Sequence, residues 1–423
     1  MRTVEPAQGT LINLGDRLTG GWAGLARRAV LDRLAGLAGA DLRLVEGDRE
    51  HRLGDGRGPL IRVTVRDARM WPALAAGGTT AAGEAYVEGW WDCDDLTALV
   101  EVLAADMDRV AAMDTGWRGL GGRLLRRLAH ALRPNTRAGA RANIAAHYDL
   151  SNEFYRLFLD ESMMYSAAIY PHADADLETA QRHRLDTICR DLRLGADDHL
   201  VEIGTGWGGM AIHAARTTGC RVTTTTISRQ QAVLARERIA AVGLAGRITV
   251  LEADYRDLPG LLGAGSATRL VSLEMVEAIG QAQYRTYART ITRLLRADGL
   301  ALVQTITVPD RRFAAAAREV DFIKRHIFPG CCIPSVATLL NATRAASDLD
   351  LVGLRDLTAD YARTLAHWRQ RFVANAAAVA SLGFDARFRR LWLFYLAYCE
   401  GGFRARAIGD VHLLLARPRA SLA

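Results

Sequence analysis

Residues 200–209 read LVEIGTGWGG, a short apolar run that passes directly into a glycine-rich loop. The run 200–203 predicts a buried strand, and the alanine-rich residues that follow the loop predict a helix. Gly204, Gly206 and Gly208 permit the tight turn and the close backbone approach to a ligand that such a loop needs. A plain turn in an α/β protein would leave a similar pattern, so the loop alone does not identify a ligand.

Strands and helices continue to alternate along the chain beyond this loop. The predicted strands are 221–227, 248–252, 270–273 and 299–306, and the predicted helices are 230–241 and 284–295. Parallel strands joined through helices require right-handed crossovers, which place helices on both faces of the sheet. The sequence therefore predicts a doubly wound, Rossmann-like α/β domain.

The spacing of the glycines argues against a dinucleotide ligand. The pattern is GxGxGG rather than GxGxxG, and an acidic residue, Glu202, stands two residues before the first glycine. The second strand ends in residues 226–231, TISRQQ, with no carboxylate at the distance of about 20 residues that would hold a ribose diol.

The residues at the ends of the next strands suit a neutral adenosyl group instead. Thr226 and Gln231 can supply hydroxyl and amide contacts. Asp254 can accept a hydrogen bond from an adenine amine, and Tyr255 offers a flat ring for stacking. We therefore predict a class I methyltransferase domain that binds S-adenosylmethionine.

The rest of the chain predicts a smaller N-terminal domain and a basic linker. The 423 residues are about 2.8 times the roughly 150 residues of one typical domain. Three regions are expected: a small α+β domain at 1–115, a linker at 116–141 and the methyltransferase domain at 142–423. Within the first region, a helix is predicted at 25–38, strands at 42–48 and 60–65, a short extended piece at 85–91 and a helix at 96–110.

Charge and cysteine content suggest where the protein acts. Lys and Arg outnumber Asp and Glu by 54 to 47, and seven arginines without any acid lie between Arg118 and Arg141. This cluster is either a solvated face or a contact for anionic lipid headgroups; no nucleic-acid module accompanies it. The longest stretch without Lys, Arg, Asp or Glu, 326–343, is broken by proline and glycine, and no apolar signal segment follows Met1. The six cysteines lack paired spacing, which predicts reduced thiols, no metal site and a cytoplasmic protein.

Several further motifs, in this order and spacing, resemble the cyclopropane-fatty-acyl-phospholipid synthases and the related mycolic-acid methyltransferases. The resemblance covers about 142–415 strongly and reaches the N-terminal part weakly through 84–91, EAYVEGWW. The motifs are NIAAHYDLSN at 143–152, MYSAAIY at 164–170, the glycine loop, TIS at 226–228, DYRD at 254–257, EMVEAIG at 274–280, IFPG at 327–330 and FRAR at 403–406.

The resemblance implies a reaction and roles for particular residues. In this family the cis double bond of an acyl chain attacks the sulfonium methyl, and the carbocation then loses a proton to bound bicarbonate. Glu277 matches the glutamate that orients the bicarbonate, Tyr361 matches its tyrosine ligand, and Ile306 matches a backbone contact. Tyr165 and Ser166 match the positions that close over S-adenosylmethionine. Taken alone, Glu277 and the neighbouring Glu274 could also be acids at a helix start, and Tyr361 an ordinary core tyrosine.

Three positions depart from the cyclopropane synthases. Ala167 replaces their usual Cys, Gln304 replaces their His, and Ala278 replaces a His after the glutamate. We still count Gln304 among the catalytic residues, because it stands at the position of that His. It can donate a hydrogen bond but cannot take up a proton as imidazole does. The sequences EMVEAIG and QTIT instead resemble a branch with tuberculostearic-acid methyltransferases, which leave an exocyclic methylene.

The function expected from the sequence is methyl or methylene transfer to an unsaturated acyl chain of a membrane phospholipid. The expected partners are the bilayer surface, at the inner face of the membrane, and a second copy of the chain, but no nucleic acid. Bicarbonate is a further expected ligand. The alternatives are a methylene-forming enzyme with the same cofactor, a small-molecule N- or O-methyltransferase, and a lipid-binding protein that keeps the fold without catalysis. The aromatic run 391–398 is either ordinary core or part of an acyl channel.

Overall fold

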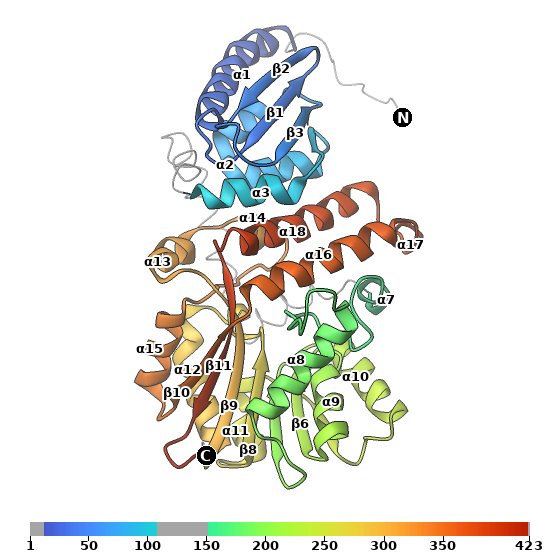
Figure 1. The fold of residues 1–423 in the computed structure, drawn as a ribbon, viewed down its shortest axis with the longest axis vertical. Coiled ribbons are helices and arrows are strands. Elements are labelled where there is room, and N and C mark those ends of the chain that lie inside the picture. Colours follow the sequence, from blue (N-terminus) through green and yellow to red (C-terminus); the bar gives the residue numbers. More distant parts are fainter. Residues whose placement is uncertain (1–11, 108–150, 422–423) are drawn as a thin grey trace, which may run out of the picture. The chain divides into compact units, whose positions relative to one another are not determined.

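The computed structural model describes residues 12–107 and 151–421 of the chain (Figure 1). The chain divides into two units, Met1–Leu125 and Arg126–Ala423. The predicted basic linker, 116–141, lies outside the described residues.

The N-terminal unit is a small α+β fold around a four-stranded sheet. The strand order is β2-β1-β3-β4, with β1 antiparallel to β2 and parallel to β3, and β3 antiparallel to β4. Its elements are α1 (Ile12–Leu34), β1 (Asp41–Glu46), β2 (Arg49–Leu53), β3 (Leu60–Val65), α2 (Met70–Val87), β4 (Trp91–Cys93) and α3 (Leu96–Ala105).

Two details of the N-terminal unit were predicted wrongly. The predicted strands at 42–48 and 60–65 form as β1 and β3, which pair in parallel, but the strand β2 between them in the sequence was not predicted. The sequence of β2, REHRL, is polar and mostly exposed, so it carries no hydrophobic signal. Residues 85–87 form the end of helix α2, a turn follows at 88–90, and only Trp91 is extended, as the first residue of β4.

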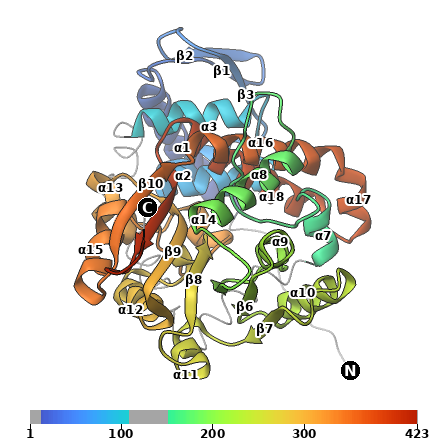
Figure 2. The ribbon, with the colours of Figure 1, turned by 60° about the horizontal axis from the view of Figure 1, so that its bottom comes forward.

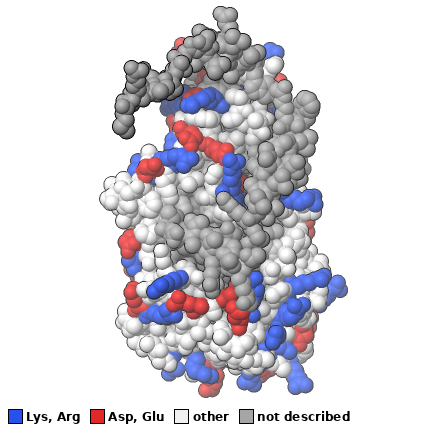
Figure 3. All heavy atoms as spheres, turned by 180° about the vertical axis from the view of Figure 1, so that it is seen from behind, with Lys and Arg blue, Asp and Glu red and all other residues white. Residues whose placement is uncertain are grey.

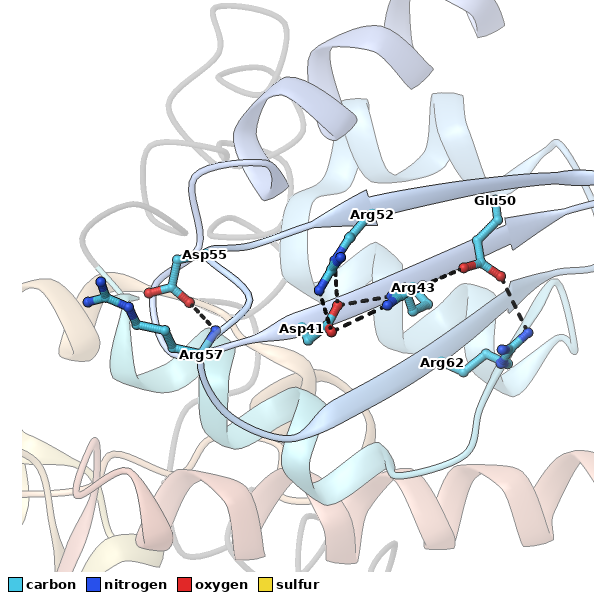
Figure 4. A network of polar contacts seen from close by, with 7 residues as sticks. All are labelled: Asp41, Arg43, Glu50, Arg52, Asp55, Arg57 and Arg62. Atoms are coloured by element: carbon cyan, nitrogen blue, oxygen red, sulfur yellow. Dashed lines mark hydrogen bonds and ion pairs between the residues drawn. The ribbon is translucent and has the colours of Figure 1, made fainter.

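Ion pairs line one face of this sheet, as Figure 4 shows. Asp41 pairs with both Arg43 and Arg52, at 3.0 and 3.1 Å, and Glu50 pairs with Arg43 at 2.9 Å and with Arg62 at 3.6 Å. Alternation along the strands sends the apolar side chains to the other face, where they are buried. Exposed pairs of this kind stabilise a fold little, so the buried face holds the unit together.

The C-terminal unit has a seven-stranded sheet with the order β10-β11-β9-β8-β5-β6-β7 (Figures 1 and 2). Its strands are β5 (His199–Ile203), β6 (Arg221–Thr226), β7 (Ile248–Glu252), β8 (Ala267–Leu273), β9 (Leu295–Thr307), β10 (Asp350–Asp356) and β11 (Gly409–Ala416). Its helices are α7 (Asn152–Arg156), α8 (Leu177–Asp191), α9 (Gly209–Thr218), α10 (Arg229–Ala241), α11 (Leu258–Leu262), α12 (Tyr284–Leu294), α13 (Asp310–Arg318), α14 (Phe322–His326), α15 (Val336–Ala346), α16 (Thr358–Ala374), α17 (Ala376–Ser381) and α18 (Ala386–Arg404).

The predicted doubly wound α/β architecture is confirmed. The strands β5 to β9 are parallel, and α8, α9 and α10 cover one face while α12 and α15 cover the other (Figure 1). The sheet is nevertheless mixed, because β11 runs antiparallel to both β9 and β10. Neither of these two strands was predicted, and β10 is an edge strand with mostly exposed residues.

The strand order changes direction at β5. The chain places β6 and β7 on one side of β5, and then β8 and β9 on its other side. Ligands of open α/β sheets bind outside the carboxyl ends of the strands at such a switch point. The glycine loop follows β5 directly, and the fold therefore places it where a ligand is expected.

Surface charge is mixed on the face shown in Figure 3, where Lys and Arg side chains lie among Asp and Glu. Ion pairs such as Arg236–Glu252, at 2.6 Å, and Arg355–Asp191, at 3.4 Å, join the two signs. Among the residues placed in the structure, no helix is both long and apolar enough to cross a membrane. All six cysteines are free thiols.

Candidate active site

A cavity of about 300 Å³ opens at the carboxyl edge of the C-terminal sheet. It lies wholly within the C-terminal unit, between the strand ends and residues of α16 and α18. All of the predicted site residues except two line its wall: Tyr165, Ser166, Gly204, Gly206, Thr226, Gln231, Asp254, Tyr255, Glu277, Ile306 and Tyr361. Gly208 and Gln304 lie outside this wall.

The glycine loop is held in a conformation that side chains disfavour. Gly204, Gly206 and Gly208 have φ angles of 103°, 50° and 85°, in the region that glycine adopts without steric cost. The N–H groups of Gly204 and Thr205 donate to the carbonyl of Thr225 at 3.0 and 2.9 Å. These bonds tie the loop to the end of β6, so that the backbone forms one wall of the cavity.

Thr226 and Gln231 are bonded to each other. The Thr226 hydroxyl donates to the Gln231 side-chain oxygen at 2.8 Å, and both side chains are buried. The bond fixes the Gln231 carboxamide with its oxygen toward Thr226, and so presents its NH₂ group as the donor for a ligand.

Asp254 also has a partner within the protein. Its carboxylate accepts hydrogen bonds from the Arg256 guanidinium at 2.7 and 2.5 Å, and from the Arg256 backbone N–H at 3.0 Å. The Tyr255 ring beside it packs edge-on against Tyr287, with the ring centroids 5.8 Å apart. Asp254 is thus a neutralised, fixed acceptor, and an adenine amine would share its oxygens with Arg256.

Glu277 follows β8, and one of its two carboxylate oxygens is hydrogen-bonded to neighbouring residues. Its Oε1 atom accepts hydrogen bonds from the Thr305 hydroxyl, at 2.8 Å, and from the Ile306 N–H. Its Oε2 atom has no hydrogen-bond partner among the described residues. Burial, with a further contribution from the charge of Glu274, raises the pKa of Glu277 to about 8.

Glu274, which was not among the predicted site residues, accepts three hydrogen bonds in the cavity wall. Its Oε1 atom accepts from the Ala167 N–H and from the Gln304 amide, each at 2.7 Å. Its Oε2 atom accepts from the Tyr361 hydroxyl, also at 2.7 Å. Burial raises the pKa of Glu274 above its ordinary value. Three donors from distant segments therefore converge on one side chain.

Gln304 connects this wall to a buried polar network behind it. Its side-chain oxygen accepts from Arg184 at 2.9 Å and contacts the His412 ring at 3.1 Å, and its NH₂ group also donates to Asp410 at 2.9 Å. Burial lowers the pKa of His412 to about 3, so this ring is neutral. Gln304 therefore holds side chains in place from behind the wall.

Sequence reasoning missed Arg184, Asp410 and His412. A signal existed for Arg184, because it shares the buried face of α8 with Gln181 and Ile188, where an apolar residue would be usual. Arg184 is completely buried, and it also donates to the hydroxyl of Ser166 at 2.8 Å.

The remaining wall of the cavity is largely apolar and aromatic. The hydroxyls of Tyr165 and Tyr395 lie 2.8 Å apart, and the Tyr361 ring packs on Phe403 with centroids 4.4 Å apart. Aromatic faces attract a nearby cation. Other side chains of this wall are Leu273, Met275, Ile279, Ile323, Phe328, Ile333, Leu365 and Ile408.

Comparison with known proteins identifies the group to which this site belongs. A family model described as mycolic acid cyclopropane synthetase matches residues 135–413. The chain belongs to this family. It is 35% identical over 376 residues to the tuberculostearic acid methyltransferase UfaA1 of Mycobacterium tuberculosis, covering 86% of this chain and 85% of that protein.

Two further relatives agree with this membership. The cyclopropane-fatty-acyl-phospholipid synthase of Escherichia coli strain K12 is 32% identical over 357 residues, which cover 82% of this chain and 85% of that protein. The structure of mycolic acid cyclopropane synthase CmaA1 complexed with SAH and CTAB matches with a TM-score of 0.59 and 28% identity, over 65% of this chain and 98% of that one. The predicted family, fold class and S-adenosylmethionine-dependent methyltransferase activity are confirmed.

Proposed function

We propose that this enzyme transfers a methyl carbon from S-adenosylmethionine to the cis double bond of an unsaturated acyl chain in a membrane phospholipid. One observation carries the proposal: two carboxylates, the half-buried Glu274 and the buried Glu277, face a largely apolar cavity that begins at the glycine loop. A polar half suits the adenosyl donor, and an apolar half suits an alkene. Relatives named for fatty-acyl substrates support this reaction class.

The residues of the polar half would bind the methyl donor. The backbone at Gly204 and Gly206, the Gln231 amide and the Asp254 carboxylate provide donors and acceptors for the adenosyl group. Tyr165 extends from the opposite wall, where its hydroxyl is fixed by Tyr395. Such fixed groups hold the sulfonium methyl against the alkene and keep water from the reacting carbon.

The chemistry follows from the two electron pairs that move. The alkene π electrons form a bond to the sulfonium methyl carbon, the C–S bond breaks toward sulfur, and the acyl chain is left as a carbocation. Loss of a proton from the transferred methyl then closes a cyclopropane ring. If a hydride first shifts from the methylated carbon to the cation, the same proton loss gives an exocyclic methylene. The aromatic rings of Tyr361 and Phe403 can stabilise the cation in the meantime.

The methylene product is the second candidate. Gln304 replaces the usual His, and a relative with 35% identity is named as a tuberculostearic acid methyltransferase. Gln304 is neutral and is hydrogen-bonded to Glu274 and Asp410, so it changes the electrostatic field at the cation. This change can favour one of the two products that the cation can form.

Attachment to a membrane surface belongs to the same proposal, as does a homodimer of the chain. The substrate is a bilayer lipid, so the enzyme works at a membrane surface, which we place at the inner face facing the cytoplasm. Arg123, Arg126 and Arg127 of the predicted basic linker are outside the described residues, and neutralising all three tests their role. We expect the variant to bind anionic vesicles more weakly than the native enzyme, with the difference shrinking at high salt.

The decisive experiment supplies the enzyme with S-adenosylmethionine and vesicles of dioleoyl phosphatidylglycerol. Fatty acids released from the vesicles should gain one CH₂ unit by mass spectrometry, and NMR distinguishes ring from methylene protons. Vesicles of the dipalmitoyl lipid are the matched control, because they lack the alkene. Methylation of a small amine or phenol in place of the oleoyl chain would contradict the proposal, as would binding of the lipid without turnover.

A further inference from the structure

The positions that the family uses for bicarbonate are filled by a side chain in this protein. The resemblance places a bicarbonate ion at Glu277 and Tyr361, and the family's usual Cys and His are replaced here by Ala167 and Gln304. In the structure the Tyr361 hydroxyl, the Ala167 N–H and the Gln304 amide all donate to the carboxylate of Glu274. Glu274 thus makes the hydrogen bonds that an external carboxylate-like anion would need.

The three donors around Glu274 have no hydrogen left for a bicarbonate ion, so the residues present do not fit bicarbonate. A tyrosine hydroxyl and a backbone N–H each have one hydrogen to donate, and a glutamine amide has two. Both amide hydrogens of Gln304 are used, one on Glu274 at 2.7 Å and one on Asp410 at 2.9 Å. A bicarbonate ion would find none of these donors free, and it would also meet the charge of Glu274. We therefore derive no step through bicarbonate.

We propose that Glu274 is the base of this enzyme: its carboxylate takes the proton that the methylated acyl cation loses, and turnover needs no bicarbonate. This assignment rests on the proposed function. The C–H bond of the transferred methyl breaks, its electron pair forms the ring bond or the methylene double bond, and the proton goes to Glu274. The Oε2 atom accepts only from Tyr361 among the described residues, so it keeps a lone pair for this proton.

The backbone at Glu274 supports a special role for the residue. Its φ angle is 49°, in the left-handed region that residues other than glycine seldom adopt. Strained positions of this kind are found where the surrounding structure enforces them, and they cluster at active sites. Here the strain turns the carboxylate toward the three donors and the cavity.

Glu274 and Glu277 divide the charge between them. Like charges that interact in a buried site do not both ionise readily. Glu274 has three donors and the attraction of the Arg184 charge, whereas Glu277 has two donors, both on one oxygen. The proton therefore resides on Glu277, and Glu274 is ionised and ready to act as a base.

Two substitutions at position 274 separate a base from a structural residue. Glu274→Gln keeps the volume and blocks the site but cannot accept a proton. Glu274→Gly suits the positive φ angle and leaves the Tyr361, Ala167 and Gln304 donors free for an added anion. The native enzyme and both variants are assayed with dioleoyl phosphatidylglycerol vesicles, in CO₂-free buffer and with added bicarbonate, with sodium chloride as the ionic control.

We expect native turnover to be equal in the two buffers. Both variants should lose about 100-fold or more in CO₂-free buffer, the usual contribution of a general base. Added bicarbonate should restore Glu274→Gly at least about tenfold, and should leave Glu274→Gln unchanged, because the amide still fills the space that an anion would need. Calorimetric titration with S-adenosylmethionine shows that each variant is folded and binds the methyl donor.

Other results would overturn the assignment in distinguishable ways. A native enzyme that makes product only with added bicarbonate would show that Glu274 is not the base, while leaving the proposed function intact. Full activity of Glu274→Gln, or failure of bicarbonate to rescue Glu274→Gly, would also remove Glu274 from the role. No product from the native enzyme in either buffer would contradict the proposed function, and this assignment with it.

Discussion

The hydroxyl of Tyr165 lies 2.8 Å from the hydroxyl of Tyr395, and this contact joins the MYSAAIY segment to helix α18 in the cavity wall. The two residues are 230 positions apart in the chain. The Tyr165 ring also packs on Trp368 of α16, with centroids 5.2 Å apart. The contact therefore joins two segments of the aromatic wall of the cavity.

Removing either hydroxyl should weaken binding of the methyl donor. We expect Tyr395→Phe to raise the Kd for S-adenosylmethionine about fivefold, the equivalent of one ordinary hydrogen bond. Tyr165→Phe should have a similar effect. Because both changes break the same bond, the double variant should be no worse than the single ones, as calorimetric titration can measure. Fully additive losses would show that the two hydroxyls act independently.

Glu277→Gln should distinguish the two carboxylates. Because burial raises the pKa of Glu277 to about 8, its carboxyl is neutral, and an amide keeps both its shape and its charge. We expect turnover on oleoyl vesicles to stay within about tenfold of the native value, whereas Glu274→Gln loses about 100-fold or more. The Kd for S-adenosylmethionine should stay within about twofold, since the variant changes one polar atom. A loss of about 100-fold in Glu277→Gln would show that Glu277, and not Glu274, is the base.

A buried acid away from the cavity gives the stability a pH dependence. Burial raises the pKa of Glu202 to about 8 from an ordinary 4.5. Between these values the native state keeps a proton that the unfolded chain releases, so the contribution to stability is full below about pH 4.5 and is lost as the pH rises toward 8.

Glu202→Gln removes this dependence, because the amide does not titrate. The free energy of unfolding of the variant should match the native value near pH 5 and exceed it near pH 8, on the order of 1–3 kcal/mol. Urea unfolding at the two pH values measures the difference between variant and native protein. The pH dependence that Glu274 and Glu277 contribute is present in both proteins and cancels in this difference. An equal difference at both pH values would mean that Glu202 is ionised in the folded protein.

The sequence predicted the part of the site that local chemistry determines. The site residues lie at the ends of parallel strands, whose carboxyl ends meet at one edge of the sheet. Thr226 ends β6, and the glycine loop, Asp254 and Glu277 follow β5, β7 and β8. Their convergence on one cavity follows from the strand order alone. The positions of Tyr165 and Tyr361 were taken from the family resemblance, since no local pattern marks them.

The network behind the wall could not be predicted in this way. The contact of Gln304 with His412 spans 108 residues, and that of Arg184 with Gln304 spans 120. The first depends on β11 pairing antiparallel with β9, and neither β10 nor β11 had been recognised. Polar residues in a strand usually point to solvent, so Asp410 and His412 gave no sign that they are buried.

Gln304→Leu tests whether that network stabilises the fold. The change would leave Arg184, Glu274 and Asp410 with one hydrogen bond fewer each, and a buried polar group without its hydrogen bond is costly. We expect the free energy of unfolding to fall by about 2–4 kcal/mol, measured by urea unfolding. A loss of less than about 0.5 kcal/mol would contradict this role.

Gly209 is the position where the loop tolerates a side chain least. A Cβ atom there would come within 2.6 Å of both the Met164 sulfur and the Ser162 carbonyl oxygen. The sulfur ends a flexible side chain and can move, but the carbonyl belongs to the backbone of the segment that leads to Tyr165. We therefore expect Gly209→Ala to lower the free energy of unfolding by about 1–3 kcal/mol and to weaken S-adenosylmethionine binding.

Gly246→Ala is the matched control for this change, because a Cβ atom at Gly246 has no neighbour within 4 Å and the residue lacks a positive φ angle. Its unfolding curve and its Kd for S-adenosylmethionine should equal those of the native enzyme. If Gly209→Ala behaved like Gly246→Ala in both measurements, the close approach of Ser162 to the loop would not be needed to shape the binding site.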